Sequence, residues 1–260
     1  MAQVNTGFLA RRRLSVAQMV SVRLVDRTRE RVAREYLRGE GLEIGALHHP
    51  LRVPAEVTVR YVDRLDVDGL REQYPELVDR PLVPVDVIDD GEVLGSQEDE
   101  SHDFVIANHF LEHTEDPIGT VENHLRVLRE GGHLYIAVPM KEATFDVLRP
   151  LTPLEHVIRD RRDGPGWSRS GHYEEWARLV DRVPEGDVSA KAADLQANGY
   201  SIHFHVWDEP EFTGFVRYLQ TQLPLRVVLS KRNRHELIVI AQKTCNRAHP
   251  ALSLGDVAAR

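Results

Sequence analysis

The stretch "HTEDPIGTVENHLRVLREGGHLYIAVP", residues 113–139, decides the fold of this chain. Pro117 follows Asp116, which is the order of a helix start, because aspartate favours the capping position and proline the first helical one. Apolar side chains then recur at helical spacing, and we expect the helix to stop at Gly131 and Gly132. An apolar run follows at once and predicts a buried strand. A helix that leads directly into a buried strand indicates a βαβ unit.

Four more short runs rich in β-branched residues lie before or next to this unit. They are "GLEIGA" (41–46), "VTVRYVDR" (57–64), "PLVPVDVID" (81–89) and "HDFVIANHF" (102–110). None alternates strictly between apolar and polar residues, which is typical of strands that are covered on both faces. The sequence therefore predicts an α/β fold, a Rossmann-like open sheet that is mostly parallel with helices on both faces.

The remaining patterns place further elements around this sheet. Residues 13–38 are amphipathic and predict one helix or two, and residues 200–222 predict a strand followed by a helix. "LRVVLSKRNRHELIVIAQK" (225–243) predicts two antiparallel strands at an edge of the sheet, with a turn near residues 231–234.

These elements divide the chain into five parts. We expect an N-terminal helical segment over 1–41, a cofactor-binding core over 42–140 and the C-terminal part of the core sheet over 199–243. Residues 141–198 interrupt the strand rhythm with helical pieces and predict an inserted helical lid that binds the acceptor. Residues 244–260 show no periodicity and are predicted to form a mobile tail.

Composition excludes several classes of function. Among the 260 residues Cys245 is the only cysteine, so an intrachain disulfide and a multi-cysteine zinc site are excluded. The formal net charge of −8 argues against a protein that grips nucleic acid. No apolar run is long enough to span a bilayer, and residues 1–20 lack the pattern of a secretory signal. These features predict a cytoplasmic protein that acts on neither nucleic acid nor a membrane.

Polar residues follow successive predicted strands where a ligand of an open α/β sheet would bind. Glu43 and Gly45 belong to the first strand end, Asp63 to the second, Asp86 to the third and Asn108 to the fourth. An acidic side chain in the place of Asp63 can accept two hydrogen bonds from a ribose diol. Glu43 has a second interpretation, a core carboxylate bonded to loop amides, and Asp63 could be a strand-end turn residue.

The order of these motifs resembles a known family. "LEIGALHHPL", "YVDRLD", "VDVIDDG", "DFVIANHFLEHTEDP" and "GGHLYIAVP" resemble the class I S-adenosylmethionine-dependent methyltransferases, and "ATFDVLRPLTPLEHV" and "SGHYEEW" resemble a group of small bacterial members. The resemblance implies S-adenosylmethionine as cofactor and methyl transfer to a small-molecule acceptor. Members of the group are often suspected of acting on sugars or other secondary metabolites.

Matching positions carry the expected cofactor contacts onto this sequence. The resemblance assigns Glu43, Gly45 and Ala46 to the methionine end, Asp63 to the ribose, Asp86 and Val87 to the adenine, and Asn108 with His109 to the wall beside the sulfonium. The family has further glycines after the first, whereas Ala46 to His49 follow Gly45 here. A sulfonium ligand has no pyrophosphate, so its loop needs a less close approach than a dinucleotide loop.

Methyl transfer to a hydroxyl needs a base, and histidine suits that task near neutral pH. Our candidates for the catalytic histidine are His172, in the predicted lid, and His109, with His203 and His205 as alternatives. We predict no metal site, because the pair His203 and His205 is by itself weak evidence for zinc. The sequence is compatible both with a homo-oligomer and with a monomer.

Two other functions compete with methyl transfer. The first is a noncatalytic protein of the same fold that binds a nucleoside ligand or a protein partner, which the glycine-poor first loop favours. The second is a dinucleotide-dependent oxidoreductase or epimerase, which is disfavoured because no G-x-G-x-x-G follows the first strand.

Overall fold

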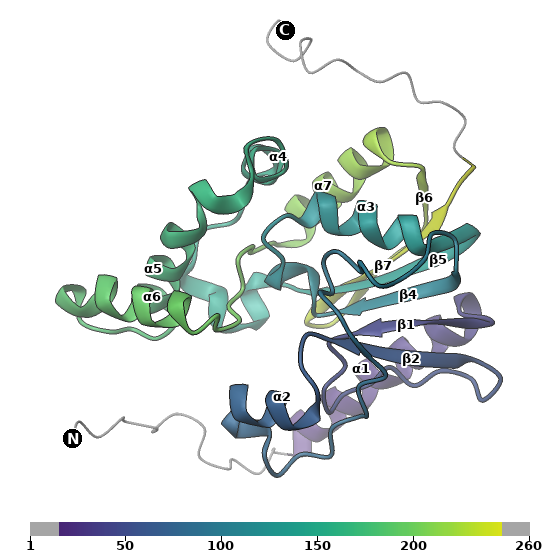
Figure 1. Cartoon of the computed structure of the whole chain (residues 1–260), viewed down its shortest axis with the longest axis horizontal. Coiled ribbons are helices and arrows are strands. Elements are labelled where there is room, and N and C mark those ends of the chain that lie inside the picture. Colours follow the sequence, from purple (N-terminus) through teal and green to yellow (C-terminus); the bar gives the residue numbers. More distant parts are fainter. Residues whose placement is uncertain (1–15, 246–260) are drawn as a thin grey trace, which may run out of the picture.

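A seven-stranded sheet with the strand order β3-β2-β1-β4-β5-β7-β6 forms the centre of the molecule (Figure 1). The structure is a computed structural model that describes residues 16–245. Five strands are parallel: β1 (Glu40–Ile44), β2 (Thr58–Asp63), β3 (Val87–Ile88), β4 (His102–Asn108) and β5 (Leu128–Pro139). The last two, β6 (Leu225–Asn233) and β7 (Glu236–Lys243), are antiparallel. The predicted mostly parallel sheet with an antiparallel edge is confirmed.

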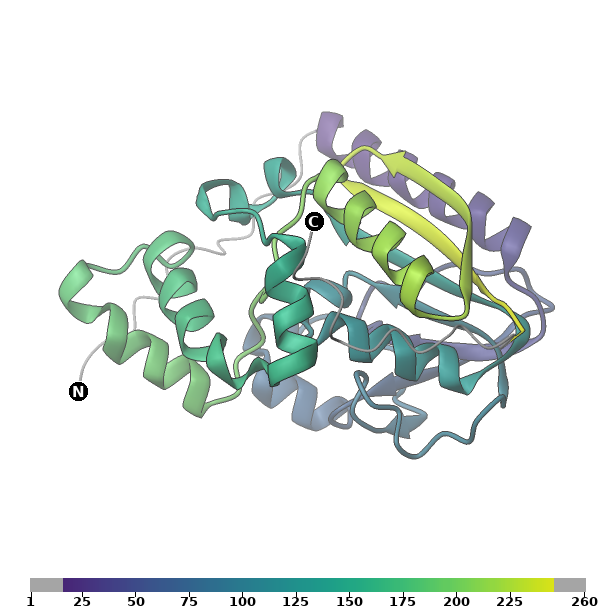
Figure 2. The same ribbon diagram turned by 90° about the horizontal axis from the view of Figure 1, so that it is seen from above.

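Helices cover both faces of this sheet. They are α1 (Val16–Tyr36), α2 (Val67–Gln73), α3 (Pro117–Val127) and α7 (Glu209–Gln222) around the sheet, and α4 (Leu154–Asp163), α5 (Arg169–Leu179) and α6 (Val188–Ala197) to one side of it (Figures 1 and 2). Short 3₁₀ helices span Pro75–Leu77, Leu111–His113, Lys141–Ala143, Phe145–Leu148, Pro165–Trp167 and Glu185–Asp187. In the described part of the chain, no helix is both long and apolar enough to cross a membrane.

Strand β4 shows why the central strands lack alternation in sequence. Val105 packs into the apolar cluster that contains α3 and α7, whereas Phe104 and Ile106 pack into the cluster that contains α1. All three side chains are fully buried. A strand between two helical layers needs apolar residues on both faces, so it appears as a continuous apolar run.

The helix after Asp116 begins as predicted but ends earlier. The Asp116 carboxylate accepts a hydrogen bond from Gly119 N at 2.9 Å and caps α3, which ends at Val127 rather than at the glycine pair. Gly131, with φ +80°, and Gly132 lie inside β5, opposite an irregularity in its pairing with β4. A side chain on Gly132 would lie 2.9 Å from two carbonyl oxygens, so the glycines permit a local distortion of the strand.

The predicted strand near residue 200 does not form. Residues 201–207 are extended and buried, but they cross from α6 to α7 without joining the sheet. Phe204 N donates to Glu112 O at 2.8 Å, and Val206 N donates to the Thr152 hydroxyl at 2.9 Å. We call residues 201–207 the crossing segment. Its backbone donors bond to loops, so its alternating sequence reflects burial from several sides and not strand pairing.

Helices α5 and α6 stand beside the sheet and have an apolar cluster of their own, whereas Val157 of α4 packs in the main cluster of the sheet. Tyr173 and Trp176 of α5 pack there against Leu195 of α6 and against Ile202 and Phe204 of the crossing segment. This cluster is separate from the two that hold the sheet. The crossing segment therefore connects the lid helices to the core.

Candidate active site

A cavity of about 830 Å³ opens where the carboxyl ends of β1 to β4 meet. Gly45 follows β1, Asp63 ends β2, Asp89 to Gly91 follow β3, and His109 follows β4, and all of them line the cavity. This is the edge at which open α/β sheets bind their ligands.

Glycines leave room at the sheet side of the cavity. Gly45 has φ +63°, a conformation that other residues rarely adopt, and its N–H donates to Val62 O at 2.9 Å. A side chain on Gly91 would approach Ile44 Cγ2 to 2.5 Å and Phe110 Cζ to 2.8 Å. Sequence reasoning missed Gly91, although the "DDG" after the third strand run was a visible turn signal.

Asp63 presents a carboxylate to this cavity. Its Oδ1 accepts a hydrogen bond from Arg64 N at 2.8 Å. Burial raises the pKa of Asp63, while the Arg64 backbone and side chain act in the opposite direction. A partly buried acceptor with one backbone donor fits the ribose diol to which the sequence assigned it.

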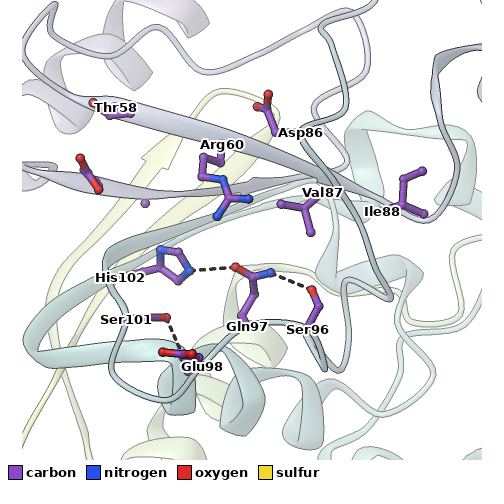
Figure 3. Close-up of a pocket in the computed structure, with 12 residues that line it drawn as sticks. Thr58, Arg60, Asp86, Val87, Ile88, Ser96, Gln97, Glu98, Ser101 and His102 are labelled. Atoms are coloured by element: carbon purple, nitrogen blue, oxygen red, sulfur yellow. Dashed lines mark hydrogen bonds between the residues drawn. The ribbon is translucent and has the colours of Figure 1, made fainter.

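The structure does not bring Asp86 or Val87 to this cavity. Strand β3 begins only after Asp86, whose Oδ2 accepts from Tyr61 N at 2.9 Å. Asp86 and Val87 line a second hollow of about 610 Å³ near the amino ends of the strands, with Arg60 and His102 (Figure 3). The strand boundary lies later than predicted, so the acidic residues at the carboxyl end of β3 are Asp89 and Asp90.

Glu43 also lies outside the cavity lining. Its side chain is fully buried, and Leu51 N donates to both of its carboxylate oxygens at 2.8 and 3.1 Å. Burial raises the pKa of Glu43 to about 7, against the opposing effect of the Leu51 hydrogen bond. Glu43 thus holds the loop from Gly45 to Leu51 through the Leu51 amide, which agrees with its second interpretation as a core carboxylate bonded to loop amides.

Ala46 and Asn108 likewise do not line the cavity. Ala46 is buried, and its carbonyl accepts from His49 N at 2.9 Å. Neither side-chain atom of the Asn108 amide has a hydrogen-bond partner among residues 16–245. Both residues flank cavity-lining neighbours, Gly45 and His109, so they support the wall from behind.

His109 does line the cavity, with φ +48°. Its Nε2 lies 2.8 Å from Glu236 Oε2, and its Nδ1 lies 3.5 Å from Glu112 Oε1. Burial lowers the pKa of His109, but the hydrogen bonds to Glu112 and Glu236 outweigh it and raise the pKa to about 9. His109 is therefore a cationic hydrogen-bond donor near neutral pH rather than a ready base.

The opposite side of the cavity is aromatic and comes from the lid and the crossing segment. Phe145, Trp176 and Tyr200 line it together with His113 and His203. The His203 ring centroid lies 4.7 Å from that of Phe145 and 6.0 Å from that of Trp176. His113 lies here rather than capping α3, a role that Asp116 fills.

His203 is held by a buried carboxylate. Its Nδ1 lies 2.7 Å from Asp146 Oδ2, and Asp146 Oδ1 accepts from Arg149 Nη1 at 2.8 Å. The carboxylate fixes the proton of the neutral ring on Nδ1, which leaves Nε2 as an acceptor. This is the arrangement of an oriented general base.

His172, our first candidate for the base, does not line the cavity. It lies one helical turn before Trp176 on α5, and four residues of helix rise by about 6 Å. Trp176 reaches the cavity, whereas the His172 ring packs against His156, Phe204 and His205.

Residues 70–136 match the family model described as "Methyltransferase domain". The match runs from α2 into β5 and contains β3 and β4, whose carboxyl ends are two of the four around the cavity. Over these residues the chain is similar to S-adenosylmethionine-dependent methyltransferases. The cofactor of this family is S-adenosylmethionine. No curated protein sequence matches the chain.

Several solved methyltransferases are similar to this chain at low sequence identity. The CurJ carbon methyltransferase is 14% identical over 80% of this chain and 49% of its own, with a TM-score of 0.44, so the chain spans about half its length. A methyltransferase from Thermotoga maritima is 16% identical over 88% and 96%, with a TM-score of 0.44. The 1,6-didemethyltoxoflavin N1-methyltransferase of Burkholderia thailandensis, solved with S-adenosylhomocysteine, is 13% identical over 88% and 80%, with a TM-score of 0.45.

Proposed function

We propose that this chain transfers a methyl group from S-adenosylmethionine to a hydroxyl of a small cytoplasmic acceptor, and that sugar-containing secondary metabolites are the acceptor class. One observation carries the proposal: a single cavity joins a carboxylate-lined strand edge to an aromatic wall with an oriented histidine. The strand edge of the cavity suits a nucleoside, and the aromatic wall suits an acceptor.

The residues of the strand edge fit the cofactor. Asp63 would accept hydrogen bonds from the ribose, and the acidic pair Asp89 and Asp90 replaces Asp86 as the candidate for the adenine end. When bound, the cofactor supplies an electrophilic methyl group on a sulfonium.

The opposite wall fits a hydroxylated acceptor. The rings of Phe145 and Trp176 offer faces on which the C–H surface of a sugar can pack. His203 Nε2 would accept the hydroxyl proton while Asp146 holds the Nδ1 proton and stabilises the imidazolium that forms. Asp146 is buried, so the ring is held in one orientation.

Calorimetry with S-adenosylhomocysteine followed by mass spectrometry on a panel of glycosylated small molecules tests this function. We expect binding of one nucleoside ligand and a methyl-transfer product. His203→Asn should retain S-adenosylhomocysteine affinity and lower single-turnover transfer by about 10²- to 10⁴-fold. His102→Asn, in the second hollow, is the matched control and should keep the wild-type rate.

The outcomes also separate the rival function. Nucleoside binding without transfer to any panel member would favour the noncatalytic interpretation. If His203→Asn turned over at the wild-type rate, His203 would not be the base, and the cofactor assignment would be unaffected.

A further inference from the structure

A second cluster of metal-ligand side chains lies outside the cavity, between the lid helices and the crossing segment. His156 and Asp160 lie four residues apart on α4, and His205 lies on the crossing segment. One ligand atom from each lies within 4.8 Å of the others. Residues four apart share one face of a helix, so α4 presents both side chains to His205.

The distances in this cluster resemble the edges of a coordination polyhedron. His156 Nε2 lies 3.3 Å from Asp160 Oδ2, and His205 Nε2 lies 3.8 Å from the same oxygen. His172 Nε2, on α5, lies 3.1 Å from His156 Nε2. Four ligands at 2.0–2.1 Å from a tetrahedral zinc ion lie about 3.3 Å from one another.

Hydrogen bonds within the protein leave this cluster short of partners. Within the described range 16–245, neither ring nitrogen of His205 has a hydrogen-bond partner. Asp160 Oδ2 likewise accepts no hydrogen bond there. His156 Nε2 faces both His172 Nε2 and Asp160 Oδ2, and its one proton can serve only one of them. Asp160 and His205 are each 1% exposed, so water at the surface does not compensate them.

Burial raises the pKa of Asp160 to about 7, although hydrogen bonds from Ser168 and Trp167 act in the opposite direction. Across the part of the chain that the structure describes, the ion pairs of this carboxylate are with His156 and His205, and none is with lysine or arginine. Its other oxygen, Oδ1, accepts from the buried Ser168 hydroxyl at 3.0 Å. That bond orients the carboxylate with Oδ2 toward the histidines, as outer partners do for metal ligands.

We propose that His156, Asp160 and His205 bind one divalent transition-metal ion. Two imidazoles and one carboxylate are donors that zinc prefers, whereas calcium and magnesium prefer oxygen alone. Three protein ligands leave the fourth position of a tetrahedral ion to a water molecule. This assignment replaces the sequence expectation that the chain has no metal site, and it does not depend on the acceptor.

The ion would fasten the lid. Its ligands come from α4 and from the crossing segment, which are far apart in the sequence. His205 lies two residues after His203, so an ion there also fixes the segment that carries the assigned base.

Zinc binding by the full-length chain tests the proposal. The protein is stripped with a chelator and titrated with Zn²⁺ against a chromophoric competitor. We expect one ion per chain, a higher Tm with Zn²⁺ than without it, and a Co²⁺ derivative with the intense visible absorption of four-coordinate cobalt. Asp160→Asn and His205→Asn should each weaken Zn²⁺ binding by more than about 100-fold, beyond the 10- to 100-fold typical of outer partners such as Ser168→Ala.

Glu112→Gln provides the matched control, because Glu112, His113 and His203 form the other candidate group at the cavity. This variant should bind Zn²⁺ as tightly as the wild type. Absence of stoichiometric binding, or binding that Glu112→Gln abolishes and Asp160→Asn retains, would overturn the assignment. If a variant fails to fold, the cobalt spectrum of the wild type still decides, because a six-coordinate spectrum contradicts a four-coordinate site.

Discussion

At the scale of single residues, Glu43 combines full burial with a single backbone donor, Leu51 N. Its pKa of about 7 in the folded chain exceeds the ordinary value of 4.5. Below pH 4.5 both the folded and the unfolded chain carry the proton. As the pH rises toward 7 the unfolded chain ionises first, so this group contributes stability at low pH and loses it as the pH rises.

Glu43→Gln should therefore stabilise the protein at pH 8, by about 3 kcal/mol, and have little effect near pH 4. Urea unfolding of variant and wild type at the two pH values measures the difference. The exposed Glu56→Gln is the control and should change neither value. Parallel stability curves for Glu43→Gln and wild type would contradict this prediction, because they would mean that the Glu43 pKa is the same in the folded and the unfolded chain.

Asp63 and Asp86 form a second pair of acidic residues that the structure separates. Asp63→Ala should weaken S-adenosylhomocysteine binding about 10- to 100-fold, because hydrogen bonds to a charged group contribute about 1.5–3 kcal/mol. Asp86→Ala should leave the affinity unchanged, since its carboxylate bonds to Tyr61 N outside the cavity. Calorimetry on both variants measures this, and equal affinities for Asp63→Ala and wild type would refute the ribose assignment.

The same pair shows what the sequence could predict about the site. Asp63 directly follows a clear apolar run, so its place at a strand end was readable. The third run, "PLVPVDVID", contains only the two-residue strand β3, and its prolines and aspartates left the boundary undefined. An error of three residues moved the assignment from Asp89 to Asp86 and so to the other end of the strand.

At the scale of elements, the lid helices touch the cofactor side through a few polar contacts. Arg64, directly after β2, donates to Gly199 O at 3.2 Å and to the Tyr74 hydroxyl at 2.9 Å. Arg169 of α5 forms an ion pair with Glu115. Contacts between partly exposed groups are individually weak, so they hold α5 loosely, whereas Val157 anchors α4 in the main apolar cluster.

Binding of S-adenosylhomocysteine should slow proteolysis within residues 141–186, because the ligand occupies a cavity that the core and the lid line together. Limited proteolysis and amide exchange with and without the ligand measure this. Helix α7, packed in the main apolar cluster, is the internal control and should show unchanged exchange. Equal cleavage in both states would mark the insertion as a fixed part of the structure.

The crossing segment shows the limit of pattern reasoning for elements. The alternation in "SIHFHVW" predicted a strand, but each side chain packs against a different partner: His203 on Asp146, Phe204 on the lid cluster and His205 near Asp160. A period of two reports only that neighbouring residues point apart. Pairing depends on backbone partners far away in sequence, which a single sequence does not reveal.

At the scale of the whole molecule, the first helix and the last strand meet beneath the cavity. Arg29 of α1 forms a two-bond ion pair with Glu236, the first residue of β7, across 207 positions of sequence. Glu236 also accepts from Asn233 Nδ2 at 2.7 Å and pairs with His109. Although burial raises its pKa, Arg29 and His109 lower the pKa of Glu236 to about 2. The Glu236 carboxylate thus connects both sheet faces to the cavity wall.

Loss of Arg29 should consequently destabilise the fold by about 3 kcal/mol, because the variant Arg29→Met leaves a buried carboxylate with fewer partners. Glu236→Gln removes that charge, so the double variant should be more stable than the sum of the single effects predicts, with a coupling above about 1 kcal/mol. Urea unfolding of the wild type, the two single variants and the double variant measures this coupling free energy. Arg52→Met, in an exposed pair with Glu30, is the control and should change stability by less than about 1 kcal/mol. Additive effects of Arg29→Met and Glu236→Gln would mean that α1 is held by its apolar face alone, and that the charge on Glu236 is set by His109.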